Sequence, residues 1–484
     1  MSATLRGLEP ALVWERFAEL TRIPRPSKAE GPAREHVLEW AGARSLEARV
    51  DQEGNVVVSV PASAGRKRAP VVVLQSHLDM VCERDPASPF DPREGRIDVR
   101  VDDDWVLADG TTLGADNGIG VAAAMAVADD AEIEHGPLEL LFTVSEEQGL
   151  DGAKALDASL VTGRMLVNLD GTSDGALTIG CAGSDHTLLR VPLTPEPVPS
   201  DQVVLRVSLS GAKGGHSGGD IAAGRANAIK ALGRVLVNTF GTAPFRLGEL
   251  AGGVSRNAIP RDAHAVVAVP ATAEEGFRTA AAGELETIVR ELAGTDDGLA
   301  VSFEATAASL AADQDATRRA LDLIQAVPTG VVAMTPGLTG VVQTSTSLTT
   351  AATHDGVLTL GSMTRSSNAA ALDGVLATMH ALARLGAAEI DVRRSYPPWE
   401  PDLDADLLAT ATRTHVRLFG IEPALTVVHG GLECAVLSQK LPGVEMISIG
   451  PEIVGPHAPG EKVRISSTQS FYRLLGALLD DLSR

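Results

Sequence analysis

Residues 71–79 read VVVLQSHLD, a continuous apolar run, Val71–Leu74, followed at once by polar residues that include His77 and Asp79. Three further runs have the same form: Leu138–Val144, Met165–Leu169 and Val444–Ile449. Continuous runs of Val, Leu and Ile separated by helix-length segments are typical of strands buried on both faces of an α/β sheet. Ligand-binding groups gather beyond the carboxyl ends of such strands, and a histidine or carboxylate follows nearly every run here. The pattern predicts an α/β fold with a site at that edge.

The hydrophobic pattern of the sequence changes between Leu189 and about Leu385. The strand-like stretches here are Val203–Leu209, Ala263–Val269, Val301–Ala305 and Val357–Met363, and the helical ones are Ala223–Thr239 and Ala273–Ala293. Alternating strands with one polar face, together with long helices, predict a smaller α+β domain. Because the polar strand ends lie before and after it, we expect residues 189–387 to form an inserted lid. The main domain is then discontinuous and comprises residues 1–188 and 388–484.

The composition excludes several classes of function. The 484 residues are 44% hydrophobic and 21% charged, and 41 Lys and Arg against 63 Asp and Glu leave a net charge of −22. A chain this acidic is repelled by phosphate backbones and by anionic lipid. No apolar run approaches the ~20 residues of a membrane span, and the first 17 residues lack the apolar core of a signal peptide. Three unevenly spaced cysteines (Cys82, Cys181 and Cys434) argue against a disulfide framework. We expect a cytoplasmic protein that binds neither nucleic acid nor membrane.

Residues near the first strand have the chemistry of metal ligands. Asp79 lies two residues after His77, on the same face of the strand, where its carboxylate can accept the second N–H of a metal-bound imidazole. Asp116 lies in the loop GADNGIG (114–120), which lacks the Lys-Ser/Thr of a phosphate-binding loop. A buried polar pair also explains His77 and Asp79, and a helix-capping turn also explains Asp116.

Further candidates follow the later strands. Glu146 and Glu147 are adjacent at a strand end, so one could bind metal while the other acts as a general base. Asp170 precedes a glycine and His457 lies in a Pro/Gly loop, and each of these four residues alone is explained by a turn or a solvated surface. Together with His77, Asp79 and Asp116 they form a set of histidines and carboxylates without cysteine, which suits zinc, or manganese or cobalt. Five protein ligands are too many for one tetrahedral zinc, but with one bridging carboxylate they serve two ions.

The chain resembles the dinuclear zinc amidohydrolase family, which contains aminoacylase, glutamate-releasing carboxypeptidases and several dipeptidases. The resemblance covers nearly the whole chain and lies in the motifs QSHLDMV, LGADNGIGVA, FTVSEEQGL, LVNLDG and GPHAPGE. Further stretches are similar to the bacterial dipeptidase subgroup that accepts aminoacyl-histidine: HLDMVCE, SGAKGGHSGGDI, GRANAIK, SRNAIP and HGGLECAVL. The resemblance implies an α/β catalytic domain with a mixed central sheet flanked by helices, and an inserted α+β lid.

The resemblance also implies a role for each candidate in the main domain. The metal ligands would be His77 and Asp170 for one ion, Glu147 and His457 for the other, and Asp116 for both. Glu146 would be the general base, and Asp79 would orient His77. The peptide bond between Asp116 and Asn117 would be cis, as it is in the family. The cofactor would be two divalent ions, zinc first, with manganese or cobalt as alternatives.

Lid residues complete the expected site. His216, in GGHSGG, would stabilise the oxyanion, although a flexible surface loop is the alternative. Asn257, in SRNAIP, would add a second polar group, and Arg365, in MTRSSN, would bind a substrate carboxylate. His429 and Glu433, in HGGLEC, are candidates for recognising the substrate amino group, against the alternative of an acid at a helix start.

The function that the resemblance implies is metal-dependent hydrolysis of the peptide bond of unblocked dipeptides, Xaa-His included. The alternative is an N-acyl-amino-acid amidohydrolase or a tripeptidase of the same family. A comparison of activity on free and on N-acetylated dipeptides distinguishes these functions. A metal-binding scaffold without catalysis is the alternative from another class, and the presence of Glu146 argues against it. The sequence leaves open the preferred side chains, the physiological metal and whether the chain forms a homodimer.

Overall fold

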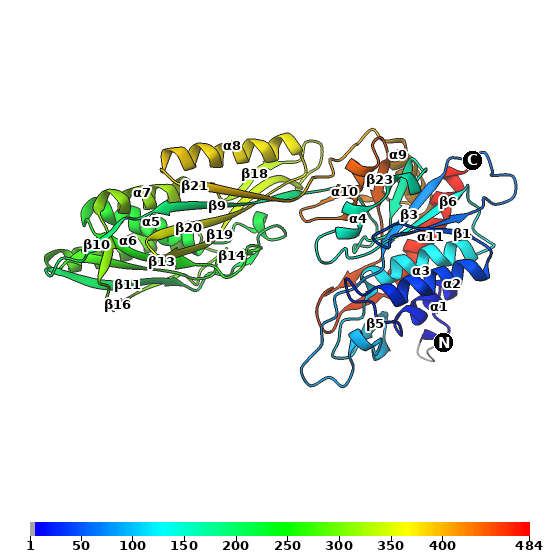
Figure 1. The fold of residues 1–484 in the computed structure, drawn as a ribbon, viewed down its shortest axis with the longest axis horizontal. Coiled ribbons are helices and arrows are strands. Elements are labelled where there is room, and N and C mark those ends of the chain that lie inside the picture. Colours follow the sequence, from blue (N-terminus) through cyan, green and yellow to red (C-terminus); the bar gives the residue numbers. More distant parts are fainter. Residues whose placement is uncertain (1–4) are drawn as a thin grey trace. The chain divides into compact units, whose positions relative to one another are not determined.

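The computed structural model describes residues 5–484 and divides the chain into two compact units (Figure 1). Unit 1 comprises the described residues up to Cys181, with Trp399–Val428 and Leu432–Arg484, and unit 2 comprises Ala182–Pro398 and His429–Gly431. The sequence-based boundaries lie at 188/189 and 387/388, several residues inside those of the structure. The difference arises because the strands that enter and leave unit 2 both pair within its sheet. Residues 1–4 of the predicted main domain lie outside the described range.

Unit 1 is built around one central sheet. Its helices are α1 (Ala11–Leu20), α2 (Gly31–Ala43), α3 (Ala115–Asp129), α4 (Asp151–Ala155), α9 (Asp406–Phe419), α10 (Glu433–Lys440) and α11 (Ile465–Leu482). Its strands are β1 (Glu47–Val50), β2 (Val56–Val60), β3 (Val72–His77), β4 (Val99–Asp102), β5 (Trp105–Ala108), β6 (Leu138–Thr143), β7 (Met165–Asn168), β8 (Ala176–Cys181), β22 (Ala424–Val428), β23 (Glu445–Ser448), β24 (Ile453–Val454) and β25 (Lys462–Arg464).

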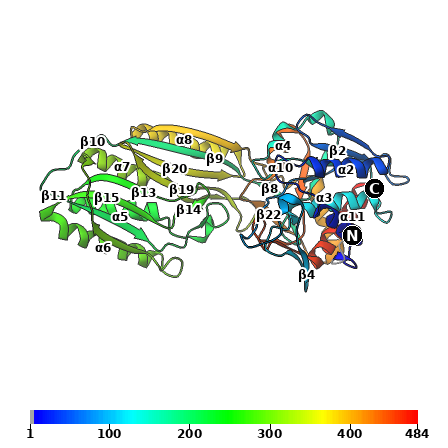
Figure 2. The same ribbon diagram turned by 60° about the horizontal axis from the view of Figure 1, so that its bottom comes forward.

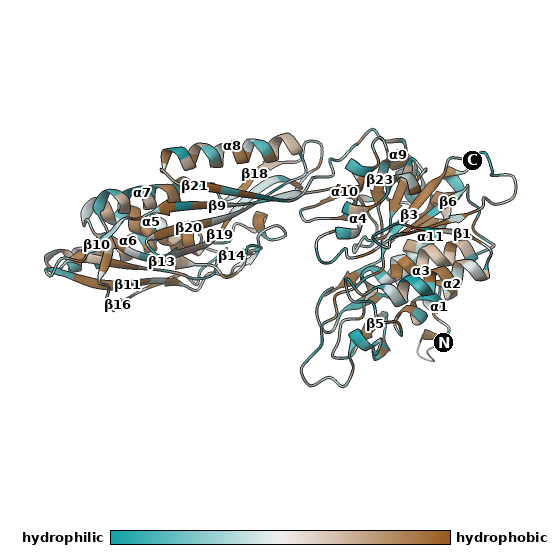
Figure 3. Cartoon of the chain, in the orientation of Figure 1, coloured by the Kyte–Doolittle hydropathy of each residue, from teal (hydrophilic) through white to brown (hydrophobic). Residues whose placement is uncertain are grey.

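The central sheet has eight strands in the order β1-β2-β6-β3-β7-β23-β8-β22. β3 runs parallel to both β6 and β7, whereas β2 runs antiparallel to β6, so the sheet is mixed as expected. Every residue of β3 and β6 is buried, which is why these strands are largely apolar in the sequence (Figure 3). Their buried polar residues are Gln75, Ser76 and His77 at the end of β3, and Glu139 and Thr143 in β6. The four predicted runs are the strands β3, β6, β7 and β23, and the predicted α/β fold class is confirmed.

Unit 2 is an α+β unit. Its strands are β9 (Gly183–Pro192), β10 (Pro195–Pro197), β11 (Gln202–Ser210), β12 (Gly215–His216), β13 (Arg246–Gly252), β14 (Ala258–Ile259), β15 (Ala263–Pro270), β16 (Ala300–Ala305), β17 (Leu310–Ala312), β18 (Gly330–Met334), β19 (Val342–His354), β20 (Val357–Ser366) and β21 (Glu389–Tyr396). Its helices are α5 (Ala228–Thr242), α6 (Glu274–Glu291), α7 (Gln314–Ala326) and α8 (Ala369–Leu385).

The large sheet of unit 2 has nine strands, in the order β16-β11-β15-β13-β19-β20-β9-β21 with β18 paired to β19, and its pairings are antiparallel (Figure 2). One apolar cluster joins all four helices to this sheet, with Leu232 of α5, Phe277 of α6, Leu321 of α7 and Met379 of α8 buried in it. The sequence predicts α5 and α6 but not α7 and α8, so the helical layer is larger than expected.

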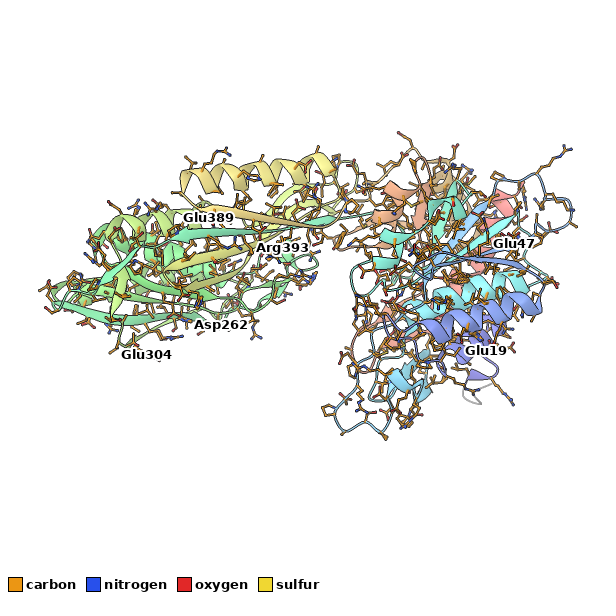
Figure 4. The ribbon with its side chains drawn as sticks, viewed as in Figure 1. Glu19, Glu47, Asp262, Glu304, Glu389 and Arg393 are labelled. Atoms are coloured by element: carbon orange, nitrogen blue, oxygen red, sulfur yellow. The ribbon has the colours of Figure 1, made fainter. Side chains whose placement is uncertain are left out.

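Charged side chains cover the outside of both units. Glu47 on β1 and Glu304 on β16 are exposed and project outward (Figure 4). Within residues 5–484, no helix is long and apolar enough to cross a membrane.

Candidate active site

The order of the strands brings the polar strand ends of unit 1 together. His77 is the last residue of β3, which lies between β6 and β7 and is parallel to both. Asp170 follows β7 by two residues, and Glu146 and Glu147 follow β6. Carboxyl ends of neighbouring parallel strands meet at one edge of the sheet, so these side chains converge around His77.

Asp116 lies among these residues and faces two imidazoles. It lies near the start of α3, at a position where the helix is interrupted by non-helical backbone, and its peptide bond to Asn117 is cis, as the resemblance implies. One carboxylate oxygen, Oδ1, is 3.1 Å from His77 Nε2, and the other, Oδ2, is 3.3 Å from His457 Nε2. The two oxygens of one carboxylate therefore point to two different histidines.

Each imidazole has a second carboxylate beside it. His77 Nε2 is 3.6 Å from Asp170 Oδ1, and His457 Nε2 is 3.0 Å from Glu147 Oε2. The ligand atoms in each of two groups lie within 4.8 Å of one another, and the groups are His77–Asp116–Asp170 and Asp116–Glu147–His457. A third group with the same spacing, His77–Glu146–Glu147, includes the expected general base. The first two groups share Asp116, which is the arrangement of two metal sites with a bridging carboxylate.

The hydrogen bonding of His77 suits a metal ligand. Its Nδ1 donates to the backbone carbonyl oxygen of Asp79, 3.1 Å away, and the ring is 1% exposed. In the neutral ring this leaves Nε2 without a proton and directed at Asp116 and Asp170. Although burial opposes the shift, Asp170 and Asp116 raise the pKa of His77 well above its ordinary value, so a positive charge between Nε2 and these carboxylates is strongly favoured. A divalent ion would supply that charge in place of the proton, so the donor set fits a metal ion.

The crowding of carboxylates leads to the same conclusion. Burial and the charge of Asp116 raise the pKa of Asp170 to about 7, although His77 partly opposes the shift. Burial raises the pKa of Glu146 well above its ordinary value, and Asp170 and Glu147 add to this shift. Among the described residues, the buried Oε1 of Glu147 has no hydrogen-bond partner. A divalent cation would remove this repulsion and would give the orphaned oxygen a partner, so the residues present fit a metal centre.

Asp79 does more than the orienting role that the resemblance implies. Its Oδ1 is 3.4 Å from His77 Nδ1 and also accepts the backbone N–H of Glu146 at 3.0 Å. Its Oδ2 accepts the backbone N–H of Glu147 at 3.2 Å and the hydroxyl of Ser27 at 2.7 Å. Although burial opposes the shift, the hydrogen bond and charge of His77, with the hydrogen bonds of Ser27 and the Glu146 backbone, lower the pKa of Asp79 to about 2. One carboxylate thus fixes a histidine and both glutamates relative to one another.

Glu433, in unit 1, is enclosed rather than open. It begins α10, is 1% exposed, and its Oε2 accepts hydrogen bonds from Gln75 and Thr143, both at 2.6 Å. Its Oε1 has no partner among residues 5–484, and burial raises the pKa of the carboxyl to about 7. Recognition of a substrate amino group by Glu433 stays a prediction.

Unit 2 assembles a second polar cluster around Arg365. This guanidinium is 4% exposed, and it donates to Asn257 Oδ1 at 3.2 Å and to the hydroxyl of Tyr396 at 3.4 Å. Its Nε has no hydrogen-bond partner, and no carboxylate of the described chain forms an ion pair with it. His429 lies in the same cluster, with Nε2 2.7 Å from Ser345 Oγ. A buried cation without a counter-charge is suited to bind an anion.

His216, on β12, is held in one tautomer. Its Nδ1 accepts the backbone N–H of Gly218 at 3.2 Å and of Gly219 at 3.0 Å, so the ring proton lies on Nε2. Burial and the positive charge of Arg365 lower the pKa of His216, which favours the neutral ring. Gly218 leaves space for this arrangement, since a Cβ there would lie 2.5 Å from the His429 carbonyl oxygen. The ring therefore presents an N–H donor away from its own loop.

Several residues of these clusters are absent from the sequence-based prediction. They are Ser27 and Glu30 in unit 1, and Ser345 and Tyr396 in unit 2. Glu30 accepts the backbone N–H of Ser145 at 2.8 Å and so holds the residue that precedes Glu146. No motif marked these residues, because they act through partners distant in the sequence. The sequence offers one usable signal for Ser27 and Glu30: both lie in a Pro-rich segment between two predicted helices.

A mixed sheet whose strand ends present histidines and carboxylates in two ligand groups is characteristic of metal-dependent hydrolases. Peptidase family M20/M25/M40 matches residues 73–481 of the chain. The chain is 36% identical to the cytosol non-specific dipeptidase of Escherichia coli (strain K12) over 482 residues, which cover 99% of each protein. It therefore belongs to peptidase family M20/M25/M40, and the predicted family and metallopeptidase class are confirmed.

Solved structures are similar over almost the whole chain. Aminoacylhistidine dipeptidase from Vibrio alginolyticus gives a TM-score of 0.92 at 35% identity, with 99% of this chain and 98% of that chain covered. The aminopeptidase PepT from Bacillus cereus gives a TM-score of 0.58 at 16% identity, with 99% and 100% covered. The second likeness shows a shared fold only.

Proposed function

We propose that this chain is a dinuclear-metal dipeptidase that hydrolyses the peptide bond of unblocked dipeptides, Xaa-His included. The observation that carries the proposal is that the two oxygens of Asp116 face two imidazoles, 3.1 and 3.3 Å away, each with a further carboxylate beside it. The names of the relatives support the substrate class: one is a cytosol non-specific dipeptidase and one an aminoacylhistidine dipeptidase.

The proposed metal ligands are His77 and Asp170 for one ion, Glu147 and His457 for the other, and Asp116 for both. Two divalent ions held there would lower the pKa of a shared water and polarise the scissile carbonyl. Zinc is the proposed metal, and manganese or cobalt suit the same ligands.

Glu146 is the proposed general base. Its backbone N–H donates to Asp79, so its position is fixed relative to His77, and its carboxyl is buried beside the ligand groups. We expect Glu146 to accept the proton of the attacking water and then to donate it to the nitrogen of the leaving amine. Asp79 acts as a positioning residue for both His77 and Glu146.

The cluster of unit 2 is proposed to bind the charged and polarised parts of the substrate. Arg365, with an unpartnered Nε and no counter-charge, suits the free carboxylate of a dipeptide. The Nε2–H of His216 suits a developing oxyanion, and Asn257 helps to hold Arg365. His429 and Glu433 are the proposed groups for the free amino end. An unblocked dipeptide offers all these charges within one small molecule.

One expectation from the sequence accompanies this proposal. The E. coli relative is named a cytosol enzyme, which supports a cytoplasmic location for this chain. A homodimer is compatible with the proposal but is not required by it.

A substrate panel tests the function. Purified protein loaded with zinc, manganese or cobalt is assayed on free dipeptides, including Xaa-His, on their N-acetylated forms and on tripeptides. We expect cleavage of the free dipeptides and much slower cleavage of the other two sets. Preference for N-acetylated substrates would assign an amidohydrolase, and preference for tripeptides a tripeptidase. A loaded protein that cleaves no amide would be a metal-binding scaffold.

A further inference from the structure

Glu461 is a buried carboxylate that the proposed mechanism does not use. It lies four residues after His457, is 2% exposed, and accepts hydrogen bonds from consecutive backbone N–H groups. Its Oε2 accepts from Leu113 at 2.8 Å and Gly114 at 2.9 Å, and its Oε1 accepts from Ala115 at 2.8 Å and Asp116 at 3.2 Å. Both oxygens are thus committed to one loop, the loop that ends in Asp116.

Arg25 holds the same loop from the other side. The guanidinium is 1% exposed, and its NH1 donates to the carbonyl oxygens of Leu78 and Asp79, both at 3.0 Å. Its NH2 donates to the carbonyl oxygen of Gly114. Arg25 therefore ties the segment that follows His77 to the segment that precedes Asp116.

The loop that Glu461 and Arg25 both contact, residues 113–116, has little freedom to adopt another conformation. Gly114 has a positive φ of +71°, and a Cβ there would lie 2.5 Å from Arg25 NH2 and 2.6 Å from the sulfur of Met80. A loop without a side chain at this position allows the guanidinium to reach the backbone directly. Its conformation is consequently set by Glu461 and Arg25.

We propose that Glu461 and Arg25 are positioning residues for the bridging carboxylate of Asp116. Glu461 fixes the loop through its N–H groups, and Arg25 fixes its distance from the strand end that carries His77. The inference rests on the proposed function, because it requires Asp116 to bind two ions. Since Asp116 is the ligand common to both groups, a displaced loop should weaken both ions together, whereas loss of an unshared ligand should weaken mainly one.

Unit 1 contains a matched control for a purely structural carboxylate. Glu139 on β6 is 5% exposed and accepts the backbone N–H groups of Thr162 at 2.8 Å and Gly163 at 3.1 Å. It holds a loop as Glu461 does, but no ligand group includes that loop. A buried glutamate that only supports the fold should behave like Glu139.

The test compares E461Q, E139Q and R25K with the wild type. Each apoprotein is titrated with zinc by calorimetry, and its folding is followed by far-UV circular dichroism without metal. We expect E461Q and R25K to bind both ions roughly 10- to 100-fold more weakly, because positioning groups around metal ligands have effects of this size. E139Q should keep wild-type zinc affinity even if its melting temperature falls. Excess zinc should restore much of the kcat of E461Q on a dipeptide, with little change in KM.

Three results would overturn the proposal. The first is that folded E461Q binds zinc with wild-type affinity. The second is that E139Q loses as much zinc affinity as E461Q does. The third is that neither E461Q nor R25K folds, which would show that Glu461 and Arg25 serve only the stability of the fold. A wild-type protein that binds no second ion would instead contradict the proposed function, and the wild-type titration reveals this separately.

Discussion

Glu146 and Glu147 are neighbours in the sequence, and they are proposed to have different roles at the active site. Replacement of Glu146 by Gln removes the proposed base but keeps a side chain of the same size. We expect Glu146→Gln to retain both ions and to lower kcat by at least ~10²-fold, the scale of a lost general base. Metal content by mass spectrometry and steady-state kinetics on a free dipeptide check this. Near-wild-type turnover would assign the base to another residue.

Arg365 is proposed to recognise the substrate carboxylate. Arg365→Ala should lower kcat/KM for a free dipeptide by roughly 10- to 100-fold, which corresponds to the loss of hydrogen bonds to a charged group. The same variant should cleave a dipeptide amide, which lacks the carboxylate, about as fast as the wild type does. Tyr396→Phe is the control, because it removes a hydroxyl 3.4 Å from the guanidinium but keeps the charge. Equal losses on the acid and the amide would exclude carboxylate recognition.

His429 gives unit 2 a predicted sensitivity to acid. Burial, with the positive charge of Arg365 and the neighbouring His216, lowers the pKa of His429 to about 4. An unfolded chain binds this proton near pH 6.5, so the wild type loses stability as the pH falls from about 6.5 towards 4. His429→Gln lacks this loss. With chelator present, the melting temperature of the wild type should therefore fall relative to that of His429→Gln as the pH is lowered from about 6.5 towards 4. A difference in melting temperature that stays constant with pH would contradict the lowered pKa of His429.

At the scale of residues, motifs predicted identities better than contacts. The metal-ligand and base candidates of unit 1 lie together around Asp116 and His77, and each is a histidine or carboxylate with recognisable chemistry. The motif residues Asn257 and Arg365 are joined in unit 2 instead. The second task of Asp79 could not be predicted, because its partner Glu146 is 67 residues away in the sequence. The roles of Arg25 and Glu461 could not be predicted for the same reason. Their contacts with the loop before Asp116 join residues that are 89 and up to 348 positions apart in the sequence.

At the scale of elements, strands buried on both faces were predictable and part of the helical layer was not. β3 and β6 are largely apolar because every residue in them is buried. α7 carries signals that were not used: Asp313 caps its N-terminus by accepting the N–H of Ala316 at 2.7 Å, and apolar residues recur at Ala316, Ala320 and Ile324. Strand β21 carries a short alternation of Ile390 and Val392 with charged residues, a signal that was not used, and nothing in this sequence identifies β9 as its partner.

The packing of α7 can be tested by a cavity. Leu321 is fully buried in the apolar cluster of unit 2, so Leu321→Ala should lower the free energy of unfolding by about 2–5 kcal/mol. All four tryptophans of the chain (Trp14, Trp40, Trp105 and Trp399) lie in unit 1. In urea unfolding of Leu321→Ala, the midpoint followed by far-UV circular dichroism should therefore fall to a lower urea concentration than in the wild type. The midpoint followed by tryptophan fluorescence should change less.

The control for this cavity is Leu385→Ala. Leu385 ends α8 and is 83% exposed, so its loss removes little buried surface. Equal effects of the two substitutions would show that α7 does not pack as described.

At the scale of the whole molecule, the chain passes between the units more often than the sequence suggests. The passages near Cys181 and Trp399 lie close to changes in composition, and the backbones of these two residues exchange hydrogen bonds of 2.9 and 3.0 Å. Residues 429–431 return to unit 2 for only three positions. A segment this short has no compositional signature, so no analysis of periodicity could reveal it.

The metal dependence of dipeptide hydrolysis tests the central claim most directly. The protein is stripped with a chelator until elemental analysis finds no bound metal, and hydrolysis of an unblocked Xaa-His dipeptide is then measured before and after addition of zinc, manganese or cobalt. We predict that stripping abolishes hydrolysis and that a divalent ion restores it, with two ions bound per chain. Full activity in protein shown to be free of metal would contradict the account.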